Sequence, residues 1–275
     1  MPAPSQSNVV RHEPVNSSTI GRLVSWMSWR TTAKARERVG LPGYECVLTV
    51  EAFQALDLLP RDEFMGPVLA RTAAAQAAGP RIRTLSAESR QAKVTILPFC
   101  NLRPGESHAW ISRDLRPKTT KVDVKPDVLI ETPSILVAVE AKLGEGSLQP
   151  RQAARQFVLL QREARRAAKL PLWILVTSGE SYSSVLEELR RDLPLVQPGV
   201  DDAPSLELLK GEVDAALGSL TWAGISQDVS KALENFGGLT SADESVRRIA
   251  SLLIEAIELH TSARPARRRK KNRSR

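Results

Sequence analysis

The sequence is poor in the residues that build zinc sites, disulfide frameworks and membrane spans. Its 275 residues include two cysteines, Cys46 and Cys100, and three histidines, none at metal-ligand spacing, which favours a reducing compartment. No apolar run approaches the roughly 18 residues of a membrane span, and the first residues lack the basic and apolar parts of a signal peptide. We therefore expect a cytoplasmic protein without a membrane partner.

Two common catalytic signatures are also missing. There is no Gly-x-Ser-x-Gly elbow, and the short glycine loop at residues 144–147 lacks the lysine and the spacing of a phosphate-binding loop. Aromatic residues make up only 4% of the chain, but 42% hydrophobic and 25% charged residues are ordinary for a globular protein. The composition therefore allows a sizeable core without pointing to a nucleotide or a serine nucleophile.

The positive charge is concentrated at the C-terminal end. The formal net charge is +8, and residues 264–275 contain eight Lys or Arg and no acid, which leaves 31 basic against 31 acidic residues elsewhere. Such a run cannot pack in a core and is typical of a disordered arm. A solubilising end, contact with nucleic-acid phosphates and a nuclear import signal stay open as its role. The nucleic-acid contacts expected here are Arg267, Arg268, Arg269, Lys270 and Lys271.

The N-terminal part is expected to be helical after a polar segment at residues 1–17. The apolar periodicity predicts three helices, the third with an irregular start because it contains Pro67. They cover residues 18–39, 48–60 and 61–80, with caps expected at Ser18, Thr49 and Asp62 and ends expected at Pro60 and Gly79-Pro80.

The middle of the chain changes to strand-like patterns, and its alternation with helices predicts a mixed α/β sheet. Strands are expected at residues 93–99, 125–131, 135–143 and 170–179, and helices at 147–169, capped by Ser147, and 183–193, with Ser184 and Glu187 as a capping box. A linker is expected at 196–205, followed by helices at 226–236 and 241–260, the latter capped by Ser241 with Glu244.

Three charged residues interrupt the most apolar strands, in the stretch "PDVLIETPSILVAVEAK" at residues 126–142. Side chains alternate faces along a strand, so Glu140 and Lys142 share one face while Val137, Val139 and Ala141 take the other. If the two strands pair as a hairpin, Asp127 can lie beside Glu140. Two neighbouring carboxylates repel unless a cation lies between them, and oxygen ligands without His or Cys favour Mg²⁺ or Mn²⁺.

Pro126-Asp127 and Glu140-Ala141-Lys142 resemble the motif of the PD-(D/E)XK nuclease superfamily. The family core runs helix, three strands, helix, strand, an order expected here from about residue 62 to 178. The resemblance implies a restriction-endonuclease-like mixed β-sheet flanked by helices, with additional helices at both ends. The expected parts are an N-terminal segment at 1–40, the nuclease-like core at 41–195, a helical extension at 196–262 and the basic tail at 263–275.

The resemblance also implies roles for individual residues. Asp127 and Glu140 would bind the metal, the Ala141 carbonyl would be an extra ligand, and Lys142 would activate the attacking water. Many members add an acid from the first helix, for which Glu63 is the first candidate, with Glu51 and Glu88 behind it. A subset has Gln followed four residues later by Tyr; Gln152 fits the Gln and is a fourth catalytic candidate, but Gln156 stands where the Tyr would be.

The resemblance implies Mg²⁺-dependent hydrolysis of DNA, with Mn²⁺ as an alternative ion, by an endonuclease. Arg151 and Arg155 on the following helix are the expected contacts to the nucleic-acid backbone. A homodimer or a partner subunit that supplies target recognition stays open. So do two other functions: a catalytically inactive protein of the same fold that binds nucleic acid or assembles with a partner, and a helical interaction protein centred on residues 201–262.

Overall fold

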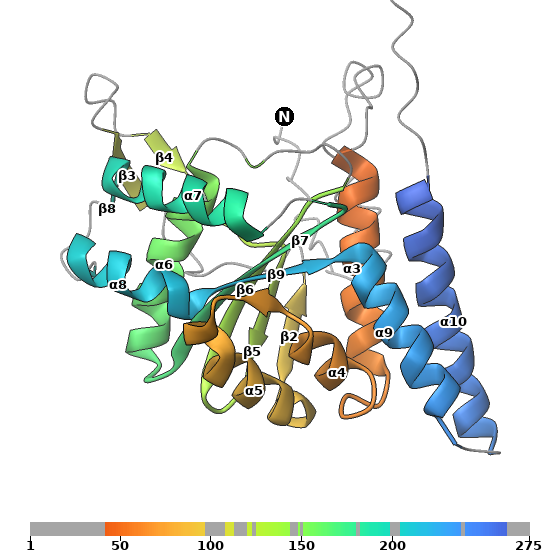
Figure 1. The fold of residues 1–275 in the computed structure, drawn as a ribbon. Coiled ribbons are helices and arrows are strands. Elements are labelled where there is room, and N and C mark those ends of the chain that lie inside the picture. Colours follow the sequence, from red (N-terminus) through yellow and green to blue (C-terminus); the bar gives the residue numbers. More distant parts are fainter. Residues whose placement is uncertain are drawn as a thin grey trace, which may run out of the picture. The chain divides into compact units, whose positions relative to one another are not determined.

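The computed structural model describes residues 42–96, 108–112, 120–122, 125–143, 148, 151–179, 182–198, 204–237 and 240–262. Within these ranges the chain forms a mixed α/β fold in which helices cover a central sheet (Figure 1). The expectation of a mixed α/β class is therefore confirmed. None of the described helices is both long enough and apolar enough to cross a membrane. The N-terminal segment at 1–40 and the tail at 263–275 lie outside the described residues.

Six of the described strands form the central sheet, in the order β1-β9-β7-β6-β5-β2. β5 pairs antiparallel with both β2 and β6, β6 and β7 are parallel, β7 and β9 are parallel, and β1 is antiparallel to β9. The strands are β1 (Ala73–Ala74), β2 (Lys93–Ile96), β5 (Val128–Glu131), β6 (Ile135–Ala141), β7 (Leu170–Thr177) and β9 (Leu217–Thr221).

A second sheet of three described strands is built from segments far apart in the sequence. β3 (His108–Ser112) lies between β4 (Thr120–Val122) and β8 (Val196–Pro198), antiparallel to both. In the sequence β3 and β4 lie between β2 and β5, and β8 lies between β7 and β9, so both parts of this sheet are insertions between strands of the central one. β8 also contacts the helix that follows β6 in the chain.

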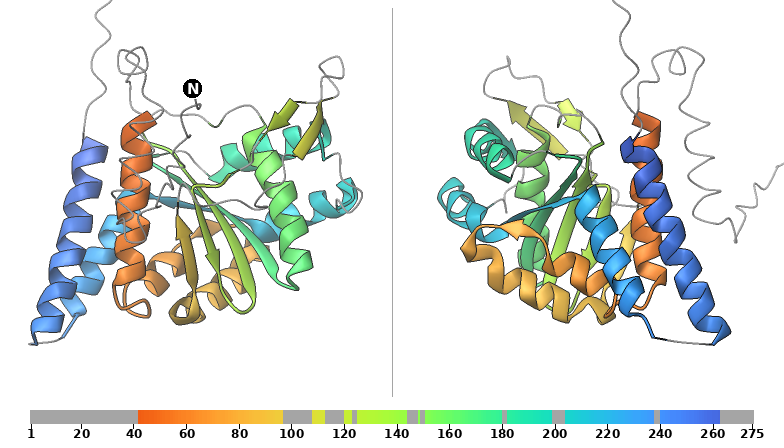
Figure 2. Two further views of the ribbon diagram at one scale, coloured as in Figure 1. Left: turned by 180° about the vertical axis from the view of Figure 1, so that it is seen from behind. Right: turned by 45° about the vertical axis from the view of Figure 1, so that its right-hand side comes forward.

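Helices pack on both faces of the central sheet, as Figure 2 shows from two further sides. Alternate residues of β6 divide between the faces: Val137 and Val139 belong to one apolar cluster, and Ala138 belongs to the other. The first cluster includes residues of α3 (Pro42–Leu58), α4 (Met65–Ala70), α5 (Gly79–Ala87), α9 (Trp222–Asn235) and α10 (Ser241–Ser262). The second includes residues of α6 (Gln152–Arg166), α7 (Tyr182–Asp192) and α8 (Leu206–Ala216).

Several helix ends differ from the sequence prediction. Thr49 lies inside α3 and is buried, so it does not cap that helix. Gly79-Pro80 begins α5 instead of ending a helix, because proline is tolerated in the first turn, where its missing N–H has no helical partner. Ser184 lies within α7, which begins at Tyr182, and Ser147 lies outside the described residues.

The cap of α10 is displaced by one residue from the predicted pair Ser241 and Glu244. Thr240 Oγ1 accepts from the N–H of Asp243 at 3.3 Å, and the Asp243 carboxylate accepts from the N–H of Thr240 at 2.9 Å. This reciprocal pair is a capping box in which Asp takes the usual place of Glu.

The part expected as a linker and a helical extension contributes two strands to the sheets. β8 lies in the expected linker, and β9 follows α8 and enters the central sheet between β7 and β1. The structure thus differs from the expected boundary at residue 195, because the central sheet needs chain from both sides of it. The remaining short elements are the 3₁₀ helices Gln76–Ala78, Ser89–Gln91 and Leu193–Leu195.

Candidate active site

The pairing of β5 with β6 brings Asp127 next to Glu140. Val128 pairs with Val139, so the next positions outward on the two strands are Asp127 and Glu140. The N–H of Asp127 donates to the Val139 carbonyl at 2.9 Å, and its Oδ2 accepts from the N–H of Ala141 at 2.8 Å. The Asp127 carboxylate therefore holds the peptide group between Glu140 and Ala141.

Glu140 lies on the face of the sheet that α6 covers. Its side chain is 2% exposed, and Lys142 Nζ lies 2.7 Å from its Oε1. Val137, Val139 and Ala141 pack into the opposite apolar cluster, as the alternation along the strand predicted. A buried carboxylate needs a cation or several donors to offset its lost hydration, and Lys142 supplies the first of these.

Two glutamines of α6 supply the other donors to Glu140. Gln152 Nε2 donates to Oε1 at 2.6 Å, and Gln156 Nε2 donates to Oε2 at 2.7 Å. The two glutamines are four residues apart and so lie on one side of the helix. Both carboxylate oxygens of Glu140 are therefore hydrogen-bonded within the described part of the chain.

The backbone of Lys142 is fixed from two sides. Its N–H donates to the Val176 carbonyl of β7 at 2.7 Å, and its carbonyl accepts from Trp222 Nε1 at 3.0 Å. Trp222 is the first residue of α9 and is fully buried. The end of β6 is thus held by both the next strand and a helix that comes 80 residues later.

The structure does not bring Glu63 to this cluster. Glu63 lies between α3 and α4, and Arg61, two residues before it, donates to the carbonyls of Arg90 and Ala92. Ala92 precedes β2 at the end where Lys93 pairs with Glu131. Asp127 and Glu131 are four residues apart along an extended strand, about 13 Å, so the Glu63 segment lies toward the far end of β5.

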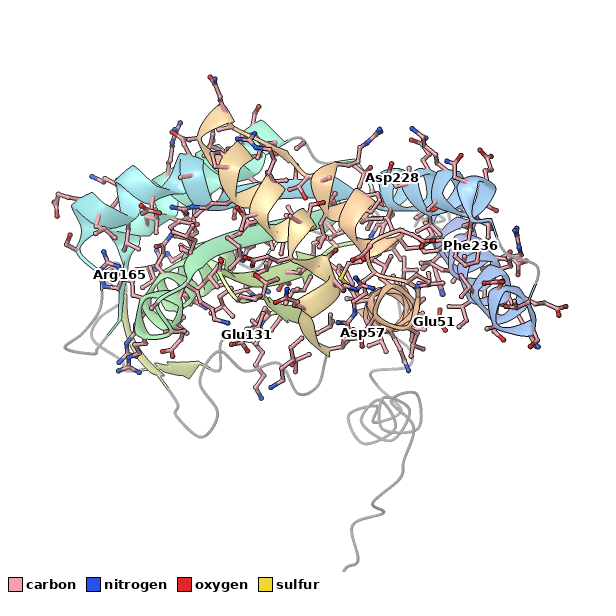
Figure 3. All side chains as sticks on the ribbon, turned by 90° about the horizontal axis from the view of Figure 1, so that it is seen from below. Glu51, Asp57, Glu131, Arg165, Asp228 and Phe236 are labelled. Atoms are coloured by element: carbon pink, nitrogen blue, oxygen red, sulfur yellow. The ribbon has the colours of Figure 1, made fainter. Side chains whose placement is uncertain are left out.

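The two other acids considered upstream also have partners elsewhere. Glu88 accepts hydrogen bonds from Thr132 Oγ1 at 2.6 Å and from Ser134, in the turn between β5 and β6 and so at the opposite end of the hairpin from Asp127. Glu51 projects from α3 (Figure 3), where its carboxylate lies 4.0 Å from His260 Nε2 of α10.

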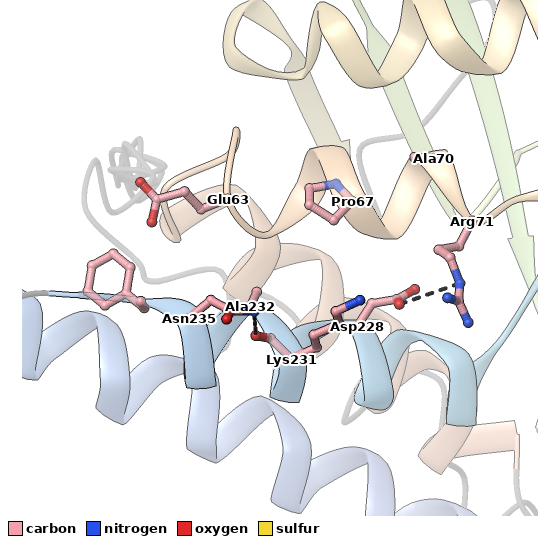
Figure 4. Close-up of a pocket in the computed structure, with 9 residues that line it drawn as sticks. Glu63, Pro67, Ala70, Arg71, Asp228, Lys231, Ala232 and Asn235 are labelled. Carbon is pink, nitrogen blue, oxygen red and sulfur yellow. Dashed lines mark hydrogen bonds and ion pairs between the residues drawn. The ribbon is translucent and has the colours of Figure 1, made fainter.

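Glu63 lines a separate pocket of about 460 Å³ between α4 and α9 (Figure 4). The buried side chain of Asp228 lines this pocket, and its Oδ1 lies 3.5 Å from Arg71 Nε. Burial raises the pKa of the Asp228 carboxyl above its ordinary value, although Arg71 and Lys231 oppose the shift. Asp127, Glu140 and Lys142 do not line this pocket.

The expected arginine surface on α6 is only partly exposed. Arg162 lies on the same side of the helix as Arg151 and Arg155. Its side chain is only 4% exposed, so it cannot contact nucleic acid at the surface. Arg151 and Arg155 are half-buried, and burial, with the charge of Arg151 next to it, lowers the pKa of Arg155. Arg267, Arg268, Arg269, Lys270 and Lys271 lie outside the described residues.

Sequence reasoning gave Gln156 and two tryptophans no role in the site. Trp173 and Trp222 are fully buried, as packing residues should be, but each also donates its indole N–H, Trp173 to Gln156 Oε1 at 2.8 Å and Trp222 to Lys142. The available signal was Gln156 itself, because an amide among the apolar residues of a buried helix face needs hydrogen-bond partners.

The donor set of the cluster is compatible with a hard divalent cation. Mg²⁺ is commonly held by one or two carboxylates and keeps several waters. Asp127 and Glu140 can supply these two carboxylates. In the described ranges no group of three or more His, Cys, Asp or Glu side chains is arranged to hold a metal. Comparisons of the chain with protein-family models, with curated proteins and with solved structures gave no match.

Proposed function

We propose that the protein is a Mg²⁺-dependent nuclease that hydrolyses DNA phosphodiester bonds, with Mn²⁺ as an alternative ion. The observation that carries the proposal is the convergence of Asp127, Glu140, Lys142 and Gln152 at one end of the β5–β6 hairpin. These are the residues that the resemblance to PD-(D/E)XK nucleases assigns to the site. Endonucleolytic cleavage, and DNA instead of RNA, follow from that resemblance.

The order of the elements supports the restriction-endonuclease-like fold. α5, β2, β5, β6, α6 and β7 follow one another as helix, three strands, helix and strand. β3 and β4 interrupt this order but lie in a separate sheet. In this proposal Asp127 before β5, Glu140 in β6 and Gln152 in α6 take the places of the family's motif residues.

Asp127 and Glu140 are the proposed protein ligands of the ion. The N–H and the carbonyl of a strand residue point to the same neighbouring strand, so the carbonyl of Ala141 shares the side of its N–H, which Asp127 binds. Ala141 is thus proposed as the further ligand. Glu63 is not among the proposed ligands, because its segment lies toward the other end of β5. When bound, the ion would supply Lewis-acid activation of the phosphate and the water.

The chain's own residues would then orient the reactants. Lys142 Nζ lies beside Glu140 with its side chain only 12% exposed, where an ammonium can donate to a water or to a phosphate oxygen. Gln152 holds the same Glu140 oxygen as Lys142. Trp222 and Val176 fix the Lys142 backbone, so its side chain starts from a defined position.

One observation favours a second function, a protein that keeps the fold to bind nucleic acid without cutting it. Glu140 already has donors on both oxygens, from Lys142, Gln152 and Gln156. Such a network can stabilise the core without any ion. The two functions differ in whether the cluster binds metal and whether DNA is cut.

The test is a cleavage assay on supercoiled plasmid and on single-stranded DNA with Mg²⁺ or Mn²⁺. We expect Lys142→Ala to lower the rate at least about 100-fold, the usual scale for loss of one donor that stabilises charge in the transition state. Lys210→Ala is the matched control, because Lys210 is exposed on α8, and it should cut like the wild type.

Equal cutting by the wild type and Lys142→Ala would contradict the assigned site. If neither protein cuts but both bind the DNA, the second function is the correct one.

A further inference from the structure

Gln156 bridges the two segments that carry the proposed metal ligands. Its side chain is 1% exposed, and its Nε2 donates to Glu140 Oε2 at 2.7 Å and to the main-chain carbonyl of Lys125 at 3.3 Å. Lys125 comes two residues before Asp127. One amide group therefore contacts both the end of β6 and the chain that leads into β5.

Trp173 determines which way this amide points. An indole N–H can only donate, and that of Trp173 donates to Gln156 Oε1 at 2.8 Å. The reverse orientation would place the amide N–H₂ against the indole N–H and the amide oxygen against the Glu140 carboxylate. Both contacts would be repulsive in a buried place, where an unmet polar group is costly. The N–H₂ group therefore faces Glu140.

We propose that Gln156, oriented by Trp173, is a positioning residue that sets the separation of the Asp127 and Glu140 carboxylates for a divalent cation. The inference rests on the proposed function, since it takes these two residues as the ligands. Lys142 and Gln152 both donate to Oε1 of Glu140, whereas in the described part of the chain Gln156 donates to Oε2. Without it the carboxylate can rotate about its last bond, and the Lys125 carbonyl loses a tie to α6.

The test measures Mn²⁺ affinity directly, by calorimetric titration of the full chain without nucleic acid, beside thermal unfolding. Gln156→Met keeps the volume of the side chain but removes both the donor and the acceptor. We expect the Kd for Mn²⁺ to rise at least about tenfold, the scale found when an outer-shell partner of a metal ligand is lost.

Gln161→Met is the matched control. Gln161 lies on the same helix and is also 1% exposed, and among the described residues its Nε2 has no hydrogen-bond partner. We expect this variant to keep the wild-type Kd, whatever its stability. A Kd that rises equally in both variants would overturn the positioning role, because it would mark a general effect of altering α6.

Glu140→Gln separates the failure of this inference from failure of the proposed function. If Glu140→Gln loses Mn²⁺ binding while Gln156→Met binds like the wild type, Gln156 does not position the site and the metal site stands. If Glu140→Gln binds like the wild type, the metal site and this inference both fail.

Trp173→Phe tests the same role if Gln156→Met does not fold, since it keeps an aromatic ring in the core but removes the N–H. A smaller rise in Kd supports the inference. An unchanged Kd in the folded variant overturns it.

Discussion

Glu88 is a carboxylate whose protonation should control the turn between β5 and β6. Its partial desolvation raises its pKa, but hydrogen bonds from Ser134 and Thr132 and the charge of Lys169 outweigh this and leave the pKa below its ordinary value. A lowered pKa means that the contribution to stability is complete above the unfolded pKa, near 4.5, and is lost as the pH falls through the lower folded value.

We expect Glu88→Gln to lower the free energy of unfolding at pH 7 by up to about 1 kcal/mol, and by less at pH 3. Urea denaturation at both pH values measures the difference. Glu234→Gln is the control, because Glu234 is exposed near the end of α9. A Glu88→Gln effect that is the same at both pH values would show that the charge of Glu88 has no part in holding the turn.

The residues that carry the candidate site were readable from the sequence as far as strand alternation reaches. Glu140 and Lys142 share a face, and the register of β5 with β6 follows from the short turn between two apolar strands. The hydrogen bonds from Gln152 and Gln156 to Glu140 depend on how α6 packs against the sheet, and the periodicity of the sequence does not predict that packing. Glu63 was placed in the site by family resemblance alone, and it is the residue that the structure does not bring there.

At the scale of elements, β9 depends on a close approach that only glycine allows. Gly218 pairs with Ala74 of β1 and Ile174 of β7, and a Cβ on it would lie 2.4 Å from Thr72 Cγ2. Thr72 cannot easily turn away, because it is buried and its Oγ1 donates to the Leu69 carbonyl at 2.7 Å. The central sheet must therefore shift or open to accept a larger residue.

We expect Gly218→Ala to destabilise the fold by about 1–3 kcal/mol, the usual cost of overpacking. Gly211→Ala on α8 should have the opposite sign, a gain of about 0.5–1 kcal/mol, because no atom lies within 4 Å of a Cβ built there. Chemical denaturation of the two variants measures both. A neutral Gly218→Ala would mean that β9 is not held tightly between its neighbours.

The elements that sequence reasoning found and missed differ in how strongly local residues specify them. β6 and β7 are long runs rich in β-branched and apolar residues, a composition that is typical of strands. β9 has the sequence "LGSLT", which contains glycine and serine and owes its strand form to pairing on both edges. α5 begins with Gly79-Pro80, residues that mark a turn as readily as a first helical turn.

On the scale of the whole molecule, the net charge lies at the C-terminal end, because residues 1–263 contain 31 basic and 31 acidic residues. The eight Lys and Arg of residues 264–275 account for the entire formal charge of +8. Nucleic-acid affinity that comes from such a run depends on released counterions, and log K falls with log salt by about 0.9 for each phosphate contact. The cluster around Glu140 is held by the sheet and α6. We therefore expect DNA cleavage at this cluster and DNA binding by the basic end to be separable functions.

We expect removal of residues 264–275 to weaken DNA binding and to lower the salt slope, by up to about 7 if all eight charges contact phosphates. The affinity is measured at several salt concentrations with a chelator present, so that no cleavage occurs. Replacing the same eight residues by Gln is the matched control, because it removes the charge and keeps the length, and it should behave like the deletion. If the deletion changes neither the affinity nor the slope, the basic end does not contact DNA, and any affinity for DNA must come from the rest of the chain. Mn²⁺ affinity should be unchanged in both variants, since the proposed ligands lie in β6 and directly before β5.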